Sequence, residues 1–587
     1  MLDAASVAGV EFSSVAVAAA LEQDPMDVED VLAGLARRAE LVRATGAEER
    51  PDGSVASRLR FVHALHAEVL YAGIAPSRRA QLHRRVAIGE ERSHGAAAAR
   101  IAATLALHYD RGRDHVQAVK HLRQAADNAA HRSARREAVG FLGRALELVP
   151  RFAEDERLPL ELAMRERRGL LLHAMGDPES ASAELAAVAE LARANGRVDV
   201  EVRALIHRAT VLYLLDRAAS AEVFARARAA SRALPDPSLA LHLQSLAAYN
   251  RLRARGYRAE DRAACAEAVR VLGDHDERAL LVPHYGRSAL FENVAGDYAA
   301  ARRLAEHGLA LSLQTGDLFD HLIARFSHAW ALLHLGEWGE MQRGLAEEIE
   351  IAERNDHPLW AALFRLQSAW MLLEAGAFDA AEALCTGAIA VGREGGHGLT
   401  QTFGHVLLAA ACVGAGKAKQ ARAELRTADE RLPAEGFVVE PIVLPQVAMV
   451  RAQVELAAGG DAAAAAAARQ VLDLTTETGE HTLRAHAHRL LAQLALRAGK
   501  PADAAKAIDA ALAEIAGGDA PLAAWRAHAA AAEIATARRK RAQAREHWSA
   551  GAAVVRRLAA SLGAEPSLRA TLLATPSVAH VLEQAAR

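Results

Sequence analysis

The stretch GKAKQARAELRTA, residues 416–428, decides the fold of this 587-residue chain. Gly416 is followed by apolar residues at 421, 425 and 428, which is the spacing of one face of an α-helix. Glycine is the residue that most readily takes the left-handed backbone conformation in which many helices end. The stretch therefore predicts a turn between two helices, the second of which packs through the face that begins at Ala421.

The same pattern returns about every forty residues. Glycines recur at 296, 336, 376 and 416, and we call these turn positions the anchors. The series continues at 256, 216 (an aspartate) and 176 and, after three inserted residues, at 459, 499 and 539 (an arginine). Alanine stands seven residues before eight of these ten anchors and five residues after eight of them. Agreement at two offsets establishes an internal repeat, which two further units with anchors at Ser93 and Ser133 extend.

The composition favours an all-α protein. Hydrophobic residues make up 52% of the chain but aromatic residues only 4%, because alanine supplies much of the apolar content. Alanine is the best helix former and lets helices approach each other closely. We therefore expect a right-handed superhelix of about twelve helix pairs over residues 76–560, in which each pair packs mainly on its neighbours around a concave groove. Residues 561–587 are expected to form a C-terminal capping tail.

These units resemble the tetratricopeptide repeat (TPR). The resemblance is carried by Gly169, Gly176, Ala181, Leu185 and Val188, and by Ala138, Leu142, Ala145 and Pro150. The period differs, because it is forty residues here and 34 in the TPR. The resemblance implies a binding scaffold, with a protein or peptide partner, or a small effector, in the concave groove.

Residues 1–75 do not keep the repeat. Three short helical stretches, the third over residues 26–40, precede two alternating segments around the Pro-Asp-Gly turn at 51–53, which predicts a hairpin. Three helices and a hairpin predict a winged-helix-like adaptor. A winged helix raises DNA binding as an alternative. However, residues 1–60 hold eleven acidic residues against six arginines, a balance that repels phosphate, so direct nucleic-acid binding is not expected.

The junction after this adaptor is similar to one found in bacterial STAND signalling ATPases. The similarity is carried by FVHALHAEVLY, residues 61–71, and RRAQLH, residues 78–83. In that family a P-loop ATPase domain precedes a winged helix and a TPR superhelix, as in large LuxR-type regulators resembling MalT and in AAA–TPR modules of cyclases and kinases. The resemblance implies the sensor and scaffold part of a signal-transduction or transcriptional regulator, with an ATPase domain in cis or in trans.

The same resemblance makes His63 a candidate nucleotide sensor. The alternative interpretation is a hydrogen-bonded histidine at the start of a helix. No G-x-x-x-x-G-K-[ST] motif occurs in the chain. We therefore expect that this chain binds no cofactor and no nucleotide phosphate. No Ser/His/Asp, Cys/His or paired-carboxylate constellation stands out either, so we expect no enzymatic activity. The rival hypothesis is a self-standing TPR scaffold for protein–protein interaction that has no ATPase partner.

Four of the six tryptophans fall between residues 330 and 370. They are Trp330, Trp338, Trp360 and Trp370. Large aromatic side chains dominate the energetics of many binding surfaces, which makes these four the candidates for lining the ligand groove. The alternative is that they fill repeat cores that the alanines leave open.

Other features are expected to be structural. Cys265 and Cys385 each lie nine residues after an anchor, where they are expected to pack in the core. The histidines of HTLRAHAHRLL, residues 481–491, do not share one helix face, so a solvated helix is expected there and no metal site. The basic run at 537–545 is expected to be a solvated capping surface.

The chain is expected to be cytoplasmic and free of the membrane. Its first residues lack the apolar core of a signal peptide, and no apolar stretch approaches the roughly 18 residues that a membrane span needs. The three cysteines show no disulfide pattern, which favours a reducing compartment.

Overall fold

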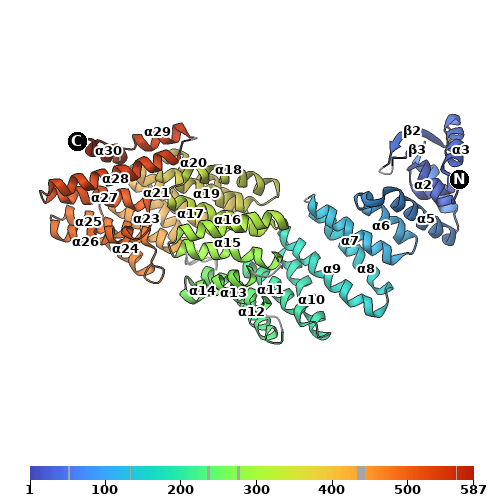
Figure 1. Ribbon diagram of the computed structural model, residues 1–587, viewed down its shortest axis with the longest axis horizontal. Coiled ribbons are helices and arrows are strands. Elements are labelled where there is room, and N and C mark those ends of the chain that lie inside the picture. The colour runs from blue at the N-terminus through green and yellow to red at the C-terminus, as the bar shows by residue number, and fades with distance from the viewer. Residues whose placement is uncertain (51–52, 133, 235–237, 274–277, 432–442, 564) are drawn as a thin grey trace. The chain divides into compact units, whose positions relative to one another are not determined.

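The computed structural model describes residues 1–587 except 51–52, 133, 235–237, 274–277, 432–442 and 564. Ser133, expected to be an anchor, and the first two residues of the Pro-Asp-Gly turn thus lie outside the described residues. The chain divides into two compact units, Met1–Pro235 and Asp236–Arg587, which we call the first and the second unit. Helices dominate both (Figure 1).

The first unit begins with helices around a small antiparallel sheet. The elements are α1 (Leu2–Ala8), β1 (Glu11–Ser13), α2 (Ser14–Leu21), α3 (Pro25–Arg38), β2 (Val42–Glu49), β3 (Val55–Phe61) and α4 (Ala64–Gly73). The predicted hairpin is confirmed, because β2 and β3 pair antiparallel with Val42 opposite Phe61. The strand order is β1-β3-β2. The sequence pattern did not predict β1, because three residues are too few for a visible alternation.

Helix pairs make up the rest of the first unit. They are built from α5 (Pro76–His94), α6 (Ala102–Arg111), α7 (His115–His131), α8 (Arg135–Leu148), α9 (Glu154–Ala174), α10 (Pro178–Ala194), α11 (Val198–Leu215) and α12 (Arg217–Ser231), with the 3₁₀ segments η1 (Gly95–Ile101) and η2 (Val149–Arg151). Consecutive helices pack against each other along the whole series.

The second unit continues the series. Its helices are α13 (Ser238–Arg255), α14 (Ala259–Gly273), α15 (Arg278–Val294), α16 (Tyr298–Thr315), α17 (Leu318–Leu335), α18 (Trp338–Arg354), α19 (Pro358–Glu374), α20 (Phe378–Glu394), α21 (Gly398–Gly414), α22 (Ala418–Arg431), α23 (Leu444–Ala457), α24 (Asp461–Leu474), α25 (His481–Arg497), α26 (Pro501–Ala516), α27 (Pro521–Ala537), α28 (Arg541–Ser561), α29 (Pro566–Ala574) and α30 (Pro576–Ala586). The all-α repeat fold is confirmed, and the described helices α5 to α28 form twelve pairs. Among them, none is long and apolar enough to cross a membrane.

The glycine anchors do what the sequence predicted, whereas the prediction for Ser93 is wrong, because Ser93 lies inside α5 and not in a turn. The glycine anchors have φ angles between +71° and +93°, the left-handed conformation that ends the first helix of a pair. The alanines seven residues before the anchors are buried, so the second helix of each pair approaches closely there. Small residues at a helix contact allow this approach because they carry almost no side chain to separate the two backbones.

The anchor at position 216 also departs from the prediction. Asp216 has a φ of −149°, which is extended backbone, and its side chain accepts hydrogen bonds from the first turn of α12 as an N-cap. Helix α12 therefore begins directly after Asp216, one or two residues earlier than the helices that follow the glycine anchors. The packing face moves with it, so that Ser220 is buried and Ala221, expected in that face, is exposed.

A chain of three rings links α4, α5 and α6 in the first unit. Tyr71 Oη lies 2.9 Å from His83 Nε2, and His83 Nδ1 lies 2.9 Å from His108 Nδ1. Both histidines are buried. Burial lowers the pKa of His83 to about 3 and that of His108 to about 4, so both are neutral at pH 7.

We therefore expect the chain to lose stability as the pH falls below 6.5. The unfolded chain binds protons at these two histidines below that pH while the folded chain does not, so protonation favours unfolding. At pH 5.5 each histidine is expected to cost about 1.4 kcal/mol relative to neutral pH. Urea unfolding of the full chain at both pH values measures this loss. The His108→Gln variant should show a weaker pH dependence, and the exposed control His63→Gln an unchanged one. Equal dependence in all three proteins would exclude the buried pair as its source.

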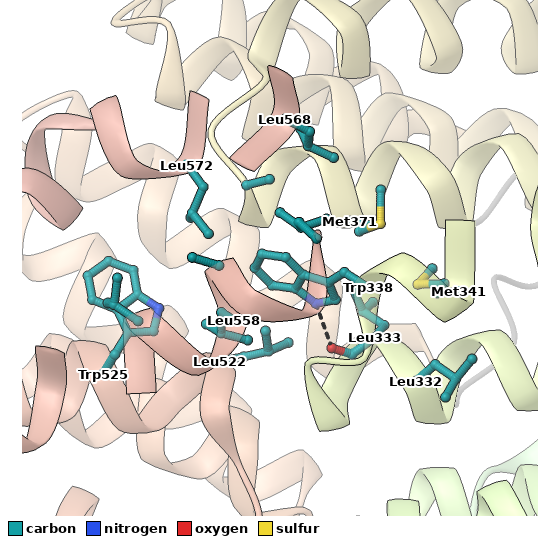
Figure 2. Packing of buried hydrophobic residues seen from close by; sticks show 14 of the residues in the cluster. Leu332, Leu333, Trp338, Met341, Met371, Leu522, Trp525, Leu558, Leu568 and Leu572 are labelled. Carbon is teal, nitrogen blue, oxygen red and sulfur yellow. Dashed lines mark hydrogen bonds between the residues drawn. The ribbon is translucent and has the colours of Figure 1, made fainter. Parts of the chain in front are cut away.

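In the second unit, late repeats pack against early ones. Neighbouring helices make most of the contacts, as expected, but α17 also contacts α27, and α18 contacts α28. An apolar cluster around Trp338 fills this junction, as Figure 2 shows, with Leu522 and Leu558 beside the indole and Leu568 and Leu572 from α29. The second unit is therefore closed by contacts between residues about two hundred positions apart.

Glycines permit the close approach at this junction. A Cβ on Gly339 would lie 2.3 Å from the backbone oxygen of Ser561, and one on Gly376 would lie 2.1 Å from Thr575 Oγ1. Real Cβ atoms do not come this near to other atoms, so only glycine fits. The backbones of early and late repeats are thus in direct contact.

Candidate functional site

The four candidate tryptophans do not share one environment. Trp330 on α17 and Trp338 at the start of α18 are buried, with 5% and 1% exposure. Trp360 and Trp370, both on α19, are half-buried. The indole of Trp338 donates from Nε1 to the oxygen of Leu333 at 3.1 Å within the apolar cluster of Figure 2. Of these four tryptophans, the two on α19 present the larger aromatic surface to solvent.

Three of the tryptophans belong to one aromatic cluster. We define this aromatic cluster as Phe326, Trp330, His334, Trp360, Trp370 and Phe403. Trp330 and Trp370 have ring centroids 6.3 Å apart, and Trp370 meets Phe403 edge-on at 5.7 Å. These separations and orientations are those that aromatic pairs prefer. The spacing of forty between Trp330 and Trp370 puts them at equivalent places in consecutive repeats, which is why the fold brings them together.

The indole nitrogen of Trp330 is an orphan donor. It is closed to solvent and has no hydrogen-bond partner among the described residues. An unpaired buried donor costs free energy, so native proteins contain few of them. The orphan donor lies in the same aromatic cluster as the half-buried rings of α19.

Polar residues from distant repeats meet beside the aromatic cluster. Tyr298, the first residue of α16, stacks on His334 with ring centroids 4.3 Å apart and donates its hydroxyl hydrogen to Glu480. Glu480 also caps α25, since its carboxylate accepts from the amide of Leu483 at 2.7 Å. Burial raises the pKa of the Tyr298 hydroxyl and lowers the pKa of His334, so both stay neutral.

The interpretation of residues 481–491 as a solvated helix is wrong. This segment begins α25, which packs against α23 and α27 as well as its partner α26. His486 is buried, and burial holds its pKa well below the usual value. The sequence pattern misses this because α25 is covered on several sides by other helices, and the repeat spacing does not encode those contacts.

His63 lies at the N-cap position of α4 and is exposed. Its side chain makes no capping hydrogen bond, and its ring packs edge-on against His66 at 5.4 Å. The histidine is thus at a helix start, as the alternative interpretation had it, but without that capping bond. Its role as a nucleotide sensor stays a prediction.

Two structural expectations are confirmed. Cys265 and Cys385 are fully buried, and burial raises the pKa of their thiols to about 11 and about 12. Protonated, buried thiols are poor nucleophiles. The arginines and lysines of the run at 537–545 are exposed.

One group of side chains in the described part of the chain has the spacing of metal ligands: Glu306, His328 and Glu340. His328 Nε2 lies 3.7 Å from Glu306 and 3.8 Å from Glu340. Arg302, however, forms ion pairs at 2.9 Å with both carboxylates. The guanidinium engages both carboxylates and offsets part of the negative charge that would attract a cation, so the group is better described as an ion-pair network.

No protein-family model matches the chain, and no curated protein matches it. Solved structures do match. The Rap protein complexed with competence and sporulation factor gives a TM-score of 0.48 at 10% identity, covering 62% of this chain and 99% of its own. A STAND protein with a tetratricopeptide repeat sensor from Pyrococcus horikoshii gives 0.45 at 10% identity, over 73% and 63% of the two chains. The APC/C hetero-tetramer Cut9-Hcn1 gives 0.40 at 15% identity, over 86% and 94%.

Proposed function

We propose that this chain is the non-catalytic sensor and scaffold part of a STAND-type signalling regulator in the cytoplasm. Its second unit binds an effector or a protein partner, and its N-terminal domain relays the bound state to an ATPase domain in cis or in trans. Such a relay requires that the ligand bind one conformation of the repeats better than another. The contact between early and late repeats is closed in the structure. A ligand that favours this closed arrangement over one in which the contact is broken would meet that requirement.

The observation that carries the proposal is the aromatic cluster. It joins consecutive repeats, it leaves Trp360 and Trp370 partly exposed, and it contains the orphan donor of Trp330. A rigid aromatic surface is what a binding site for a peptide or small effector needs, and the donor of Trp330 would become available to a ligand if the rings that cover it moved. A purely structural core would have buried the rings fully and paired the donor.

The N-terminal domain supports the adaptor part of the proposal. Its order of elements, three helices with a short strand and then a hairpin, is that expected of a winged helix. His63 sits on its surface where α4 begins, without a capping bond that would occupy its ring. We propose that the ring of His63 contacts, and so senses, the nucleotide bound by an ATPase domain.

Selection of peptides tests the binding role. Peptides from a random library are selected on the full chain, and their affinities are measured for the wild type, Trp360→Ala and Trp370→Ala. Truncating an aromatic anchor of a binding site is expected to weaken binding about tenfold or more. Phe141→Ala, a half-buried aromatic residue of the first unit, is the control and should leave affinity unchanged. Peptides that bind all four proteins equally would refute the aromatic cluster as the binding site.

A second test separates the STAND proposal from a self-standing scaffold. The coding sequence upstream of Met1 and the neighbouring genes are read for a G-x-x-x-x-G-K-[ST] motif between a strand and a helix. If an ATPase domain is found there, its binding to this chain is measured with and without His63→Ala. Weaker binding to the variant supports the regulator. Absence of any such domain favours the self-standing scaffold.

A further inference from the structure

Two histidines from distant repeats are buried together in the second unit. His334 lies in the last turn of α17, among the early repeats, and His486 lies on α25, among the late repeats. They are 3% and 9% exposed. The two are close enough for their charges to interact, since His334 adds to the effect of burial in lowering the pKa of His486. Early and late repeats thus each contribute a titratable ring to one buried cluster.

The surroundings of His486 disfavour a proton. Burial, followed by the charges of Arg526 on α27 and Arg489 on α25, holds its pKa well below the usual value of 6.5. Its Nδ1 is closed to solvent and has no hydrogen-bond partner among the described residues. His486 is therefore neutral at pH 7, and a proton on it would add a cation close to two others.

The surroundings of His334 are more evenly balanced. Its Nδ1 donates a hydrogen bond to the carbonyl oxygen of Trp330 at 3.0 Å. Burial lowers its pKa, the carboxylates of Glu480 and Glu374 raise it, and His481 lowers it. The effect of burial prevails, so His334 is also neutral at pH 7.

The two carboxylates near His334 are already engaged by other donors. Glu480 accepts from the Tyr298 hydroxyl and from two backbone amides in the first turn of α25. Glu374 is paired with Arg526 at 2.7 Å. A protonated His334 would compete with Tyr298 for Glu480. Because the bond from Tyr298 to Glu480 joins early to late repeats, this competition works against the closed arrangement.

We propose that the contact between early and late repeats is an acid-sensitive switch, which opens when His334 and His486 bind protons. A charge in a buried cluster is costly, and separating the late repeats from the early ones lets water solvate it. In the open arrangement both rings bind protons at about pH 6.5, whereas the closed arrangement excludes them. Closure is therefore favoured above that pH and is weakened as the pH falls below it. The inference goes beyond the proposed function, because it requires no ligand.

The expected effect grows with acidity. Each histidine that is protonated only in the open form lowers the ratio of closed to open molecules about tenfold per pH unit below about 6.5. Two such histidines lower it about a hundredfold by pH 5.5. The slope of the logarithm of this ratio against pH counts the protons taken up on opening, and it is expected to be about two.

Energy transfer between two dyes measures this ratio. Leu313→Cys on α16 and Lys506→Cys on α26 introduce labelling sites at exposed positions, while the three native cysteines are buried. Transfer is recorded from pH 7.5 to 5.0 with dyes that do not titrate in this range, and circular dichroism follows the helix content. Transfer is expected to fall while the helix content stays unchanged, because opening separates helix pairs without unfolding them.

Glutamine variants of the labelled protein identify the protons. His334→Gln and His486→Gln remove one titratable ring each, so each should lower the slope by about one, whatever the variant does to the stability of the closed form. His307→Gln removes an exposed histidine of α16 and should leave the slope unchanged. If one of the two buried variants does not close at pH 7.5, the other still gives the slope.

Three results would overturn the inference: energy transfer that is constant down to pH 5.0, a fall in transfer that coincides with loss of helix, or an equal slope in all four proteins. None of these measurements uses a peptide, so the switch can fail while the proposed function stands.

Discussion

Replacing Trp338 with alanine is expected to lower the free energy of unfolding by about 3–5 kcal/mol. The indole is the largest fully buried side chain of the described residues, at 1% exposure. It packs among leucines from α27, α28 and α29, so its loss leaves a cavity that the rigid helices on either side cannot close (Figure 2). The hydrogen bond from its Nε1 to Leu333 is lost as well.

Denaturant unfolding of the full chain measures this effect, and Trp360→Ala is the control. Trp360 lies on α19 one repeat later and is half-buried, so its truncation removes less contact and leaves a site open to water. Its cost should be well below that of Trp338→Ala. Equal losses for the two variants would mean that the junction between early and late repeats is not closed in solution.

The second prediction concerns the sign of two glycine substitutions. Gly339→Ala in α18 is expected to destabilise the chain by about 1–3 kcal/mol, because the new methyl group would lie 2.3 Å from the backbone oxygen of Ser561. A backbone atom cannot move aside as a flexible side chain does. Helix α28 would have to shift away from α18, and the apolar cluster around Trp338 would open with it.

Gly387→Ala is the matched control, and it should act in the opposite direction. Gly387 is exposed in the middle of α20, and a Cβ there meets nothing within 4 Å. Alanine is the better helix former, so this variant is expected to gain about 0.5–1 kcal/mol. The two variants are compared by the same unfolding measurement. A gain in both would show that α18 and α28 are not in contact.

The repeat and its turns could be predicted because they are local. The anchor glycines and the alanines on both sides of them act within one helix pair, so their effect is visible at a fixed spacing in the sequence. Where the anchor is Asp216 the prediction missed by one residue, because an aspartate caps the next helix and does not end the previous one in the left-handed conformation. The fold class does not depend on that residue.

The closed junction could not be predicted, because no local pattern encodes it. Tyr298 and Glu480 are 182 residues apart, and their contact depends on how small rotations between successive pairs add up. The candidate site was predicted only in part, because only some of its contacts follow from the repeat spacing. Trp330 and Trp370 occupy equivalent repeat positions and their rings meet. Trp338 lies instead in the apolar cluster at the junction, against which Trp360 and Trp370 also pack.

The contact of early with late repeats changes how the second unit can move. In an open solenoid each helix pair contacts only its neighbours, so a force at one end is absorbed by small changes at each interface between pairs. Helix pairs that are joined at Trp338 and at Tyr298 resist gradual stretching, because any separation exposes the indole and breaks the hydrogen bond from Tyr298 to Glu480. We therefore expect the second unit to open in one cooperative step. A ligand that binds the closed form better than the open form would then shift a single equilibrium and so affect both ends of the unit.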